Sequence, residues 1–205
     1  MRLSWGALVL PLLACVLTGL TLPTHAAGSF SFTAIDFPGA TDTYTFGIND
    51  SGEIVGFFRE AGRSGHGFLR SGTGAFTVID VPGAATTSAL KINHVGQIVG
   101  TFVDARGKFH GFLRDPTGVV TTIEAPVPGA TGTHAFDITD AGQIVGFFGG
   151  VAKGHGFLRT ATGVFATIDA PGAIQTPALG INEAGKIVGV FEDAGAKHHG
   201  FVATR

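Results

Sequence analysis

The sequence predicts an all-β fold that is built from one unit repeated four times. Each unit contains an I-V-G step followed by an H-G-F step, and the H-G-F steps recur about every 44 residues along the chain. Repetition at such a period marks folds in which single units cannot bury their apolar surface alone, so that neighbouring units must stack. The 33 Gly and 18 Phe residues suit tight turns and apolar strands, and no helical periodicity appears after the N-terminal 26 residues.

Each unit divides at turn residues into four short segments that favour β-structure. In the first unit these segments span residues 43–49, 53–59, 65–70 and 75–80. The turn between the first and second segments opens with Asn or Thr and closes with Gly three residues later, as a type I turn followed by a left-handed glycine requires. The four turns of this kind begin at Asn49, Asn93, Thr139 and Asn182.

The order of the segments predicts how the repeats close. After the N-terminal region the chain opens with a lone fourth-type segment, residues 30–36, and it ends with a third-type segment, residues 199–205. The opening segment is therefore free to complete the last unit. This predicts a four-bladed β-propeller with four strands per blade, in which the N-terminal strand completes the last blade. Another closed all-β repeat fold is the alternative.

A histidine and a carboxylate recur 14 residues apart, at positions that face each other across the third and fourth segments. A hydrogen-bonded pair at this place would stabilise the hairpin. Three pairs are expected within units and one across the chain ends: His66 with Asp80, His110 with Glu124, His155 with Asp169, and His199 with Asp36. We interpret these pairs as structural. No metal or other cofactor is expected, because the ligands of a metal ion must converge within a few ångströms.

The turns between first and second segments carry a polar residue directly after the Asn or Thr. These residues are Asp50, His94, Asp140 and Glu183. Each turn supplies at most one carboxylate, whereas calcium needs several oxygen ligands. We therefore interpret the turns as hairpin caps.

Residues 1–26 predict a secretory signal peptide. Arg2 precedes an apolar stretch, and small residues lead to a cleavage site after Ala26. Residues 27–205 are then expected to form a single four-repeat domain without cysteine, secreted to the extracellular space or the periplasm. A lipobox-like sequence that ends at Cys15 makes an outer-membrane lipoprotein the alternative.

The sequence GINDSGEIVG at residues 47–56, followed by HGFLR at residues 66–70, resembles the bacterial HAF-type extracellular repeat family. The likeness recurs in all four units and covers nearly the whole chain after residue 26. The resemblance implies an exported repeat protein, and it brings no established activity or catalytic residues.

The motifs and the charge restrict the function. The chain has no G-x-S-x-G, no H-E-x-x-H and no phosphate-binding glycine loop, so we assign no catalytic residue. A net charge of −2 without a basic stripe argues against nucleic acid as a partner. We expect a non-enzymatic binding or adhesion module that recognises a polysaccharide, a surface or a protein, with a glycan or a cell-surface protein as its partner. A structural envelope scaffold and a hydrolase with its site at the channel mouth are the alternatives.

A specific ligand is expected where the repeat breaks. Lys91 and Asp137 stand where two other units have glycine in the first segment. The first strands of a propeller line its channel, so these two side chains are expected to face it, either as an ion pair or as ligand contacts. Tyr44 and His134 occupy variable positions nearby. The predicted ligand-binding residues are therefore Tyr44, Lys91, His134 and Asp137.

Overall fold

The computed structural model describes residues 29–205 except residues 63, 151 and 152. The predicted signal peptide, with Cys15, lies outside the described residues. The chain divides into two units, Met1–Ala34 and Ile35–Arg205, and the described residues of the first unit contain no strand or helix. In the part of the chain that is described, no helix has the length and apolar character needed to cross a membrane.

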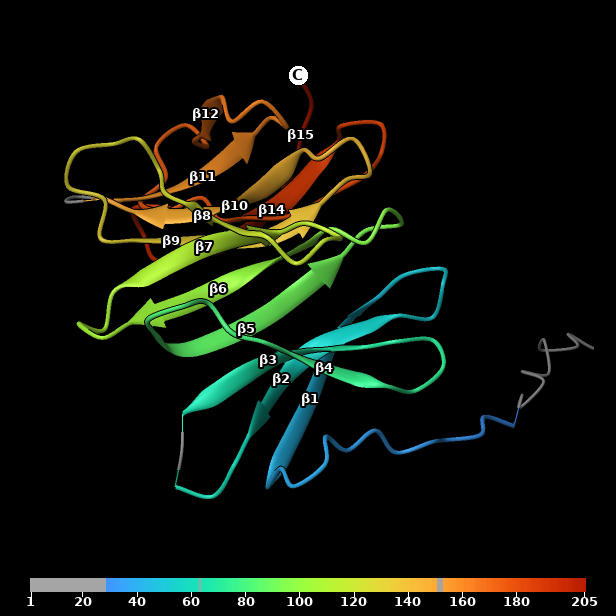
Figure 1. Ribbon diagram of the computed structural model, residues 1–205. Coiled ribbons are helices and arrows are strands. Elements are labelled where there is room, and N and C mark those ends of the chain that lie inside the picture. The colour runs from blue at the N-terminus through green and yellow to red at the C-terminus, as the bar shows by residue number, and fades with distance from the viewer. Residues whose placement is uncertain (1–28, 63, 151–152) are drawn as a thin grey trace, which may run out of the picture. The chain divides into compact units, whose positions relative to one another are not determined.

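The second unit consists of antiparallel sheets (Figure 1). The first sheet contains β1 (Asp42–Ile48), β2 (Ile54–Arg59), β3 (Gly65–Arg70) and β4 (Phe76–Ile79). The second contains β5 (Ala84–Ile92), β6 (Ile98–Asp104), β7 (Phe109–Arg114) and β8 (Val120–Ile123). The third contains β9 (Gly132–Ile138), β10 (Ile144–Gly149), β11 (Gly154–Arg159) and β12 (Phe165–Ile168). The fourth contains β13 (Ala178–Ile181), β14 (Ile187–Glu192) and β15 (His198–Ala203). The predicted all-β fold with one antiparallel sheet per repeat is confirmed for the described residues.

The turn between the first two strands of each sheet follows the predicted pattern. In the first sheet the Gly52 N–H donates to the carbonyl of Asn49 over 3.0 Å, and Gly52 takes a positive φ of 73°. The Asn49 side chain accepts a hydrogen bond from the Glu53 N–H over 3.0 Å. Its amide nitrogen also donates to the carbonyl of Asn93 in the next sheet, over 3.3 Å. In the same way the side-chain amide of Asn93 donates to the Thr139 carbonyl over 3.0 Å. The turns therefore tie neighbouring sheets together.

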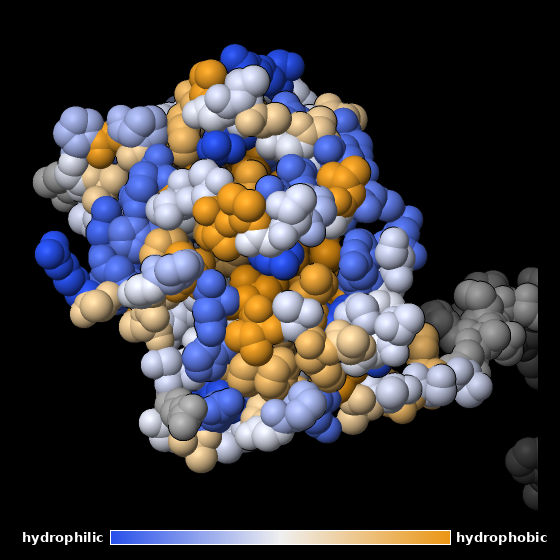
Figure 2. All heavy atoms as spheres, viewed as in Figure 1, coloured by the Kyte–Doolittle hydropathy of each residue, from blue (hydrophilic) through white to orange (hydrophobic). Residues whose placement is uncertain are grey.

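The hydrophobic core lies between successive sheets. Strands β2 and β3 pack on β5, strands β6 and β7 pack on β9, and β10 packs on β13. At each interface the valine of the I-V-G step lies fully buried among apolar residues of the next sheet. Val55 packs in this way with Ala89, Ile92 and Ile98. Val99 packs with Ala135, Ile138 and Ile144, and Val145 packs with Ala178 and Ile187. Figure 2 shows hydrophobic residues gathered over the middle of one face, with hydrophilic residues around them.

Three of the four predicted histidine–carboxylate pairs form. The Nδ1 atom lies 2.9 Å from a carboxylate oxygen both in His66–Asp80 and in His155–Asp169. His110 Nδ1 contacts Glu124. Each of these histidine rings also stacks on a phenylalanine of the preceding strand, with ring centroids 4.8 to 5.3 Å apart. These histidines therefore belong to the hairpins, as the sequence predicts.

The N-terminal strand that was predicted to complete the last blade is not formed. The fourth sheet has three strands with β15 at its edge, and residues 29–41 contain no strand. His199 Nε2 lies 3.1 Å from Asp193 Oδ2, and the described residues include no hydrogen bond between His199 and Asp36. The physical reason is the separation of the first and fourth sheets. Their strands do not pack on each other as neighbouring sheets do, and the second and third sheets lie between them (Figure 1).

Candidate functional site

A pocket of about 280 Å³ lies at the ends of β1, β5, β9 and β13. The four repeats reach it because each of these first strands packs on the next one along the chain. We call it the first-strand pocket. Its charged lining residues are Asp50, Lys91, His94, Asp137, Asp140 and Glu183.

One group of these residues comes from the turns that follow the first strands. His94 Nε2 lies 2.7 Å from Asp50 Oδ2, and His94 Nδ1 lies 3.3 Å from Asp140 Oδ2. The backbone N–H of His94 donates to the other carboxylate oxygen of Asp140 over 2.9 Å. The Asp140 N–H in turn donates to Glu183 over 3.0 Å. Equivalent positions of four repeats thus form one continuous polar chain.

The carboxylates around His94 change its acidity. The hydrogen bond to Asp50 raises the pKa of His94 above 6.5, and the charges of Asp50, Asp140 and Glu183 add to this effect, while burial opposes it. Both ring nitrogens face carboxylate oxygens, so the imidazolium, which donates from both nitrogens, is the form that satisfies them. Asp140 fixes the ring through Nδ1 and through the backbone, whereas Asp50 is largely exposed. The Nε2 proton therefore points at the Asp50 carboxylate, which is the more exposed of the two partners.

Lys91 and Asp137 meet in the same pocket. Lys91 Nζ lies 3.7 Å from Asp137 Oδ1. Asp137 is held by the backbone, because it accepts hydrogen bonds from the N–H groups of Ile138 over 2.9 Å and Ile181 over 3.0 Å. The predicted ion pair therefore exists, with a fixed carboxylate and a half-exposed ammonium group. A contact of these residues with a ligand stays a prediction.

The other two predicted ligand-binding residues do not line this pocket. Tyr44 lies further along β1 and faces Phe57, with ring centroids 6.1 Å apart. His134 lies in β9 beside Phe109, with ring centroids 4.9 Å apart, and burial lowers its pKa below 6.5. The structure therefore divides the four predicted residues between the pocket and two other places.

The turn residues were missed as a site by the sequence reasoning, which interpreted them as hairpin caps only. The caps exist, but the residue after each cap points toward its neighbours in the adjoining repeats. The detectable signal was that these polar residues occupy one equivalent position in four repeats. Among the described residues, no group of three or more His, Cys, Asp or Glu side chains is placed to hold a metal ion.

No protein-family model and no curated protein matches the chain. The resemblance to the HAF-type repeat family therefore stays a prediction. Among the solved structures to which the chain is similar, two are of virginiamycin B lyase from Staphylococcus aureus. A catalytically inactive variant with quinupristin shows 15% identity and a TM-score of 0.46, and the likeness covers 78% of this chain and 56% of that one. A selenomethionine-substituted form shows 9% identity and a TM-score of 0.37, with 77% and 69% covered.

The comparison corrects one prediction. Both similar structures are of an enzyme, which contradicts the expected non-enzymatic binding or adhesion module, and we withdraw that expectation. This chain spans little more than half the length of the first of them. Likenesses this remote transfer no lyase activity and no catalytic residue to the chain.

Proposed function

We propose that the protein is an enzyme that uses His94 as a proton donor on a small, positively charged substrate held in the first-strand pocket. The observation that carries this proposal is the position of His94 between Asp50 and Asp140, with distances of 2.7 and 3.3 Å from its two ring nitrogens. A histidine whose orientation is fixed by a carboxylate and whose pKa is raised can protonate a leaving group near neutral pH. The reaction class is therefore acid-assisted hydrolysis: His94 Nε2 gives its proton to the leaving group as that group's bond breaks, a water molecule bonds to the carbon left behind, and a proton from that water restores the imidazolium.

The charge of the pocket defines the substrate class. Four carboxylates line it, namely Asp50, Asp137, Asp140 and Glu183, against two cationic groups, Lys91 and His94. Lys91 is already paired with Asp137. The remaining negative charge favours a substrate with an ammonium group, which can form an ion pair with the exposed carboxylate of Asp50.

The finer description of the fold belongs to the same proposal. The four sheets, packed face to face in chain order, are blades of a β-propeller, and the first-strand pocket is the mouth of its channel. A fourth strand of the type found in residues 30–36 completes the last blade. The signal-like residues 1–26 support export of the protein.

Fluorogenic substrates that carry an ammonium group test the proposal. Lysine 7-amido-4-methylcoumarin is a suitable probe, because its amine leaving group departs only when it is protonated. We expect turnover by the wild-type protein and a loss on the order of 10²-fold in His94→Gln. His66→Gln makes the same change in a histidine of a hairpin and should keep the activity.

The pH profile gives a second measurement. Activity should fall as pH rises through the raised pKa of His94, because the imidazolium is the donor. NMR resonances of the His94 ring should also shift when glucosamine or lysine is added. Turnover that survives in His94→Gln, or a His94 ring that responds to neither amine, would contradict the proposal.

A further inference from the structure

Sheets at the two ends of the series expose apolar side chains whose equivalents in the other repeats are buried. The valine of the I-V-G step is 0% exposed in three repeats (Val55, Val99, Val145), but Val188 in β14 is 48% exposed. At the other end Ile48 in β1 is 64% exposed, whereas the equivalent Ile92 is 2% exposed. These residues would be buried by an interface of the kind that joins successive sheets.

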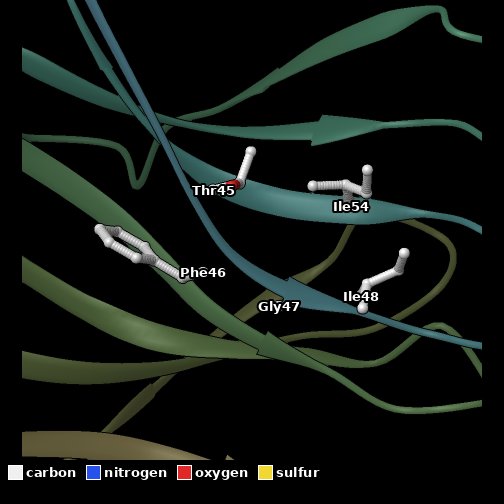
Figure 3. A pocket seen from close by; sticks show the side chains of 5 residues that line it. All are labelled: Thr45, Phe46, Gly47, Ile48 and Ile54. Atoms are coloured by element: carbon white, nitrogen blue, oxygen red, sulfur yellow. The ribbon is translucent and has the colours of Figure 1, made fainter. Parts of the chain in front are cut away.

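The exposed face of β1 contains a pocket of about 230 Å³, lined by Thr45, Phe46, Gly47, Ile48 and Ile54. Figure 3 shows Thr45, Ile48 and Ile54 on one side of β1 and Phe46 on the other. Thr45, Ile48 and Ile54 occupy the repeat positions of the residues that enclose Val55 in the second sheet, Ala89, Ile92 and Ile98. The pocket therefore resembles the surface that encloses the valine of a preceding sheet. Val188 is the I-V-G valine that no following sheet of the same chain encloses.

The fourth sheet lacks a strand beside β15. In the first three sheets the glycine of the H-G-F step has no room for a Cβ, because that atom would come within 3.4 Å of an isoleucine of the fourth strand. At Gly200 in β15 a Cβ would meet nothing within 4 Å. A pocket of about 310 Å³ lies at this edge, with Phe191, Phe201 and Val202 among its lining residues. In the first and third sheets the first residue of the fourth strand packs on the phenylalanine equivalent to Phe201, with ring centroids 5.5 and 5.3 Å apart.

Residues 30–36 have the sequence of the absent strand. Residues 32–36 read F-T-A-I-D, and the fourth-strand residues 76–80 read F-T-V-I-D. Phe32 is 94% exposed. The register of β3 with β4 pairs Gly67 with Ile79 and Arg70 with Phe76. The same register places Ile35 opposite Gly200 and Phe32 opposite Ala203.

We propose that the β13–β15 face docks on the β1 face of a second copy of this chain, and that residues 30–36 of that copy add the fourth strand to β15. The interface would repeat the three sheet–sheet interfaces that already exist within the chain. A second copy is required because Phe37 holds the end of the segment on the first sheet, with its ring 3.7 Å from that of Phe58. The strands of the first and fourth sheets of one chain do not pack on each other as those of neighbouring sheets do, so in this proposal a second chain supplies the segment. Head-to-tail docking satisfies both faces of each chain when two copies close on each other. The docking is independent of the role of His94.

A cysteine pair tests which chain supplies the strand. Thr33→Cys and Val202→Cys, in a Cys15→Ser background, should form a disulfide because residues 33 and 202 face each other in the proposed register. We expect a covalent dimer on a non-reducing gel, and neither cysteine alone should give it. The matched control is Leu113→Cys with Thr121→Cys, a pair that lies opposite within one chain on β7 and β8. It should run as a monomer.

The mass in solution tests the apolar face. Sedimentation should give a mass of at least two chains for the wild-type protein. Val188→Asp should reduce the mass to one chain, and Val119→Asp, which changes a valine 61% exposed in the loop before β8, should leave it unchanged. A wild-type mass of one chain, or a Thr33–Val202 disulfide within a monomer, would overturn the proposal.

Discussion

Replacement of Val145 by alanine should destabilise a single chain much more than replacement of Val188 by alanine. Both residues are the valine of an I-V-G step, but Val145 is fully buried against Ala178 and Ile187, and Val188 is about half exposed. Val145→Ala removes two methyl groups, each worth about 0.8 kcal/mol of burial, and leaves a cavity that adds about 1 kcal/mol. The free energy of unfolding should therefore fall by about 2.5 kcal/mol in Val145→Ala and by about 1 kcal/mol or less in Val188→Ala.

Urea unfolding followed by circular dichroism is the suitable assay, because Trp5 lies in the N-terminal region outside the repeats and Tyr44 is the one tyrosine. With a slope of about 2 kcal/mol per M, Val145→Ala should lower the urea midpoint by about 1.2 M. The measurement should use a protein concentration at which the protein is monomeric. Equal losses at the two positions under those conditions would refute the reasoning, since Val188 would then be enclosed within its own chain.

Three further outcomes are expected. Gly156→Ala should lower the urea midpoint strongly, because the added Cβ would come within about 2.4 Å of a backbone carbonyl oxygen. Asp140→Asn should lower the pKa of His94, measured by NMR, because one of the charges that raise it is removed; an unchanged pKa would show that this carboxylate does not act on the ring. Hydrogen bonds, first among them that from the Lys108 N–H, hold the pKa of Asp104 below 3.8. The stability that the Asp104 carboxylate contributes should therefore be complete above pH 3.8 and should be lost as pH falls through the lower pKa of the folded state. The urea midpoints of Asp104→Asn and the wild type should accordingly differ less at pH 2 than at pH 7.

The strands, turns and side-chain pairs within each sheet were predicted well because they depend on residues that are close together in the sequence. The Asn49-to-Gly52 turn and the His66–Asp80 pair depend on residues a short distance apart on one hairpin, where turn geometry and register decide the outcome. The separation of the first and fourth sheets was not predictable in the same way. It depends on the rotation between packed sheets, which the repeat period does not specify.

The site was predicted only in part for the same reason. Lys91 and Asp137 were found because they interrupt a glycine position on strands that were expected to converge. Tyr44 and His134 were selected for variation alone, and variation does not say which way a side chain points. The contact of His94 with Asp50 and Asp140 joins three repeats, so it appears only when the turns of adjoining sheets are brought together.

The side-chain hydrogen bonds that tie the turns of neighbouring sheets together have a consequence for the order of unfolding. Asn49 and Asn93 each donate a side-chain hydrogen bond to the next repeat, but the third repeat has Thr139 at this position, and a threonine side chain has no amide to donate. The buried cluster between the third and fourth sheets is also smaller, with four buried residues against eight in each of the other two. The fourth sheet is therefore the first to open, and its backbone amides should exchange with solvent deuterium before those of the other three.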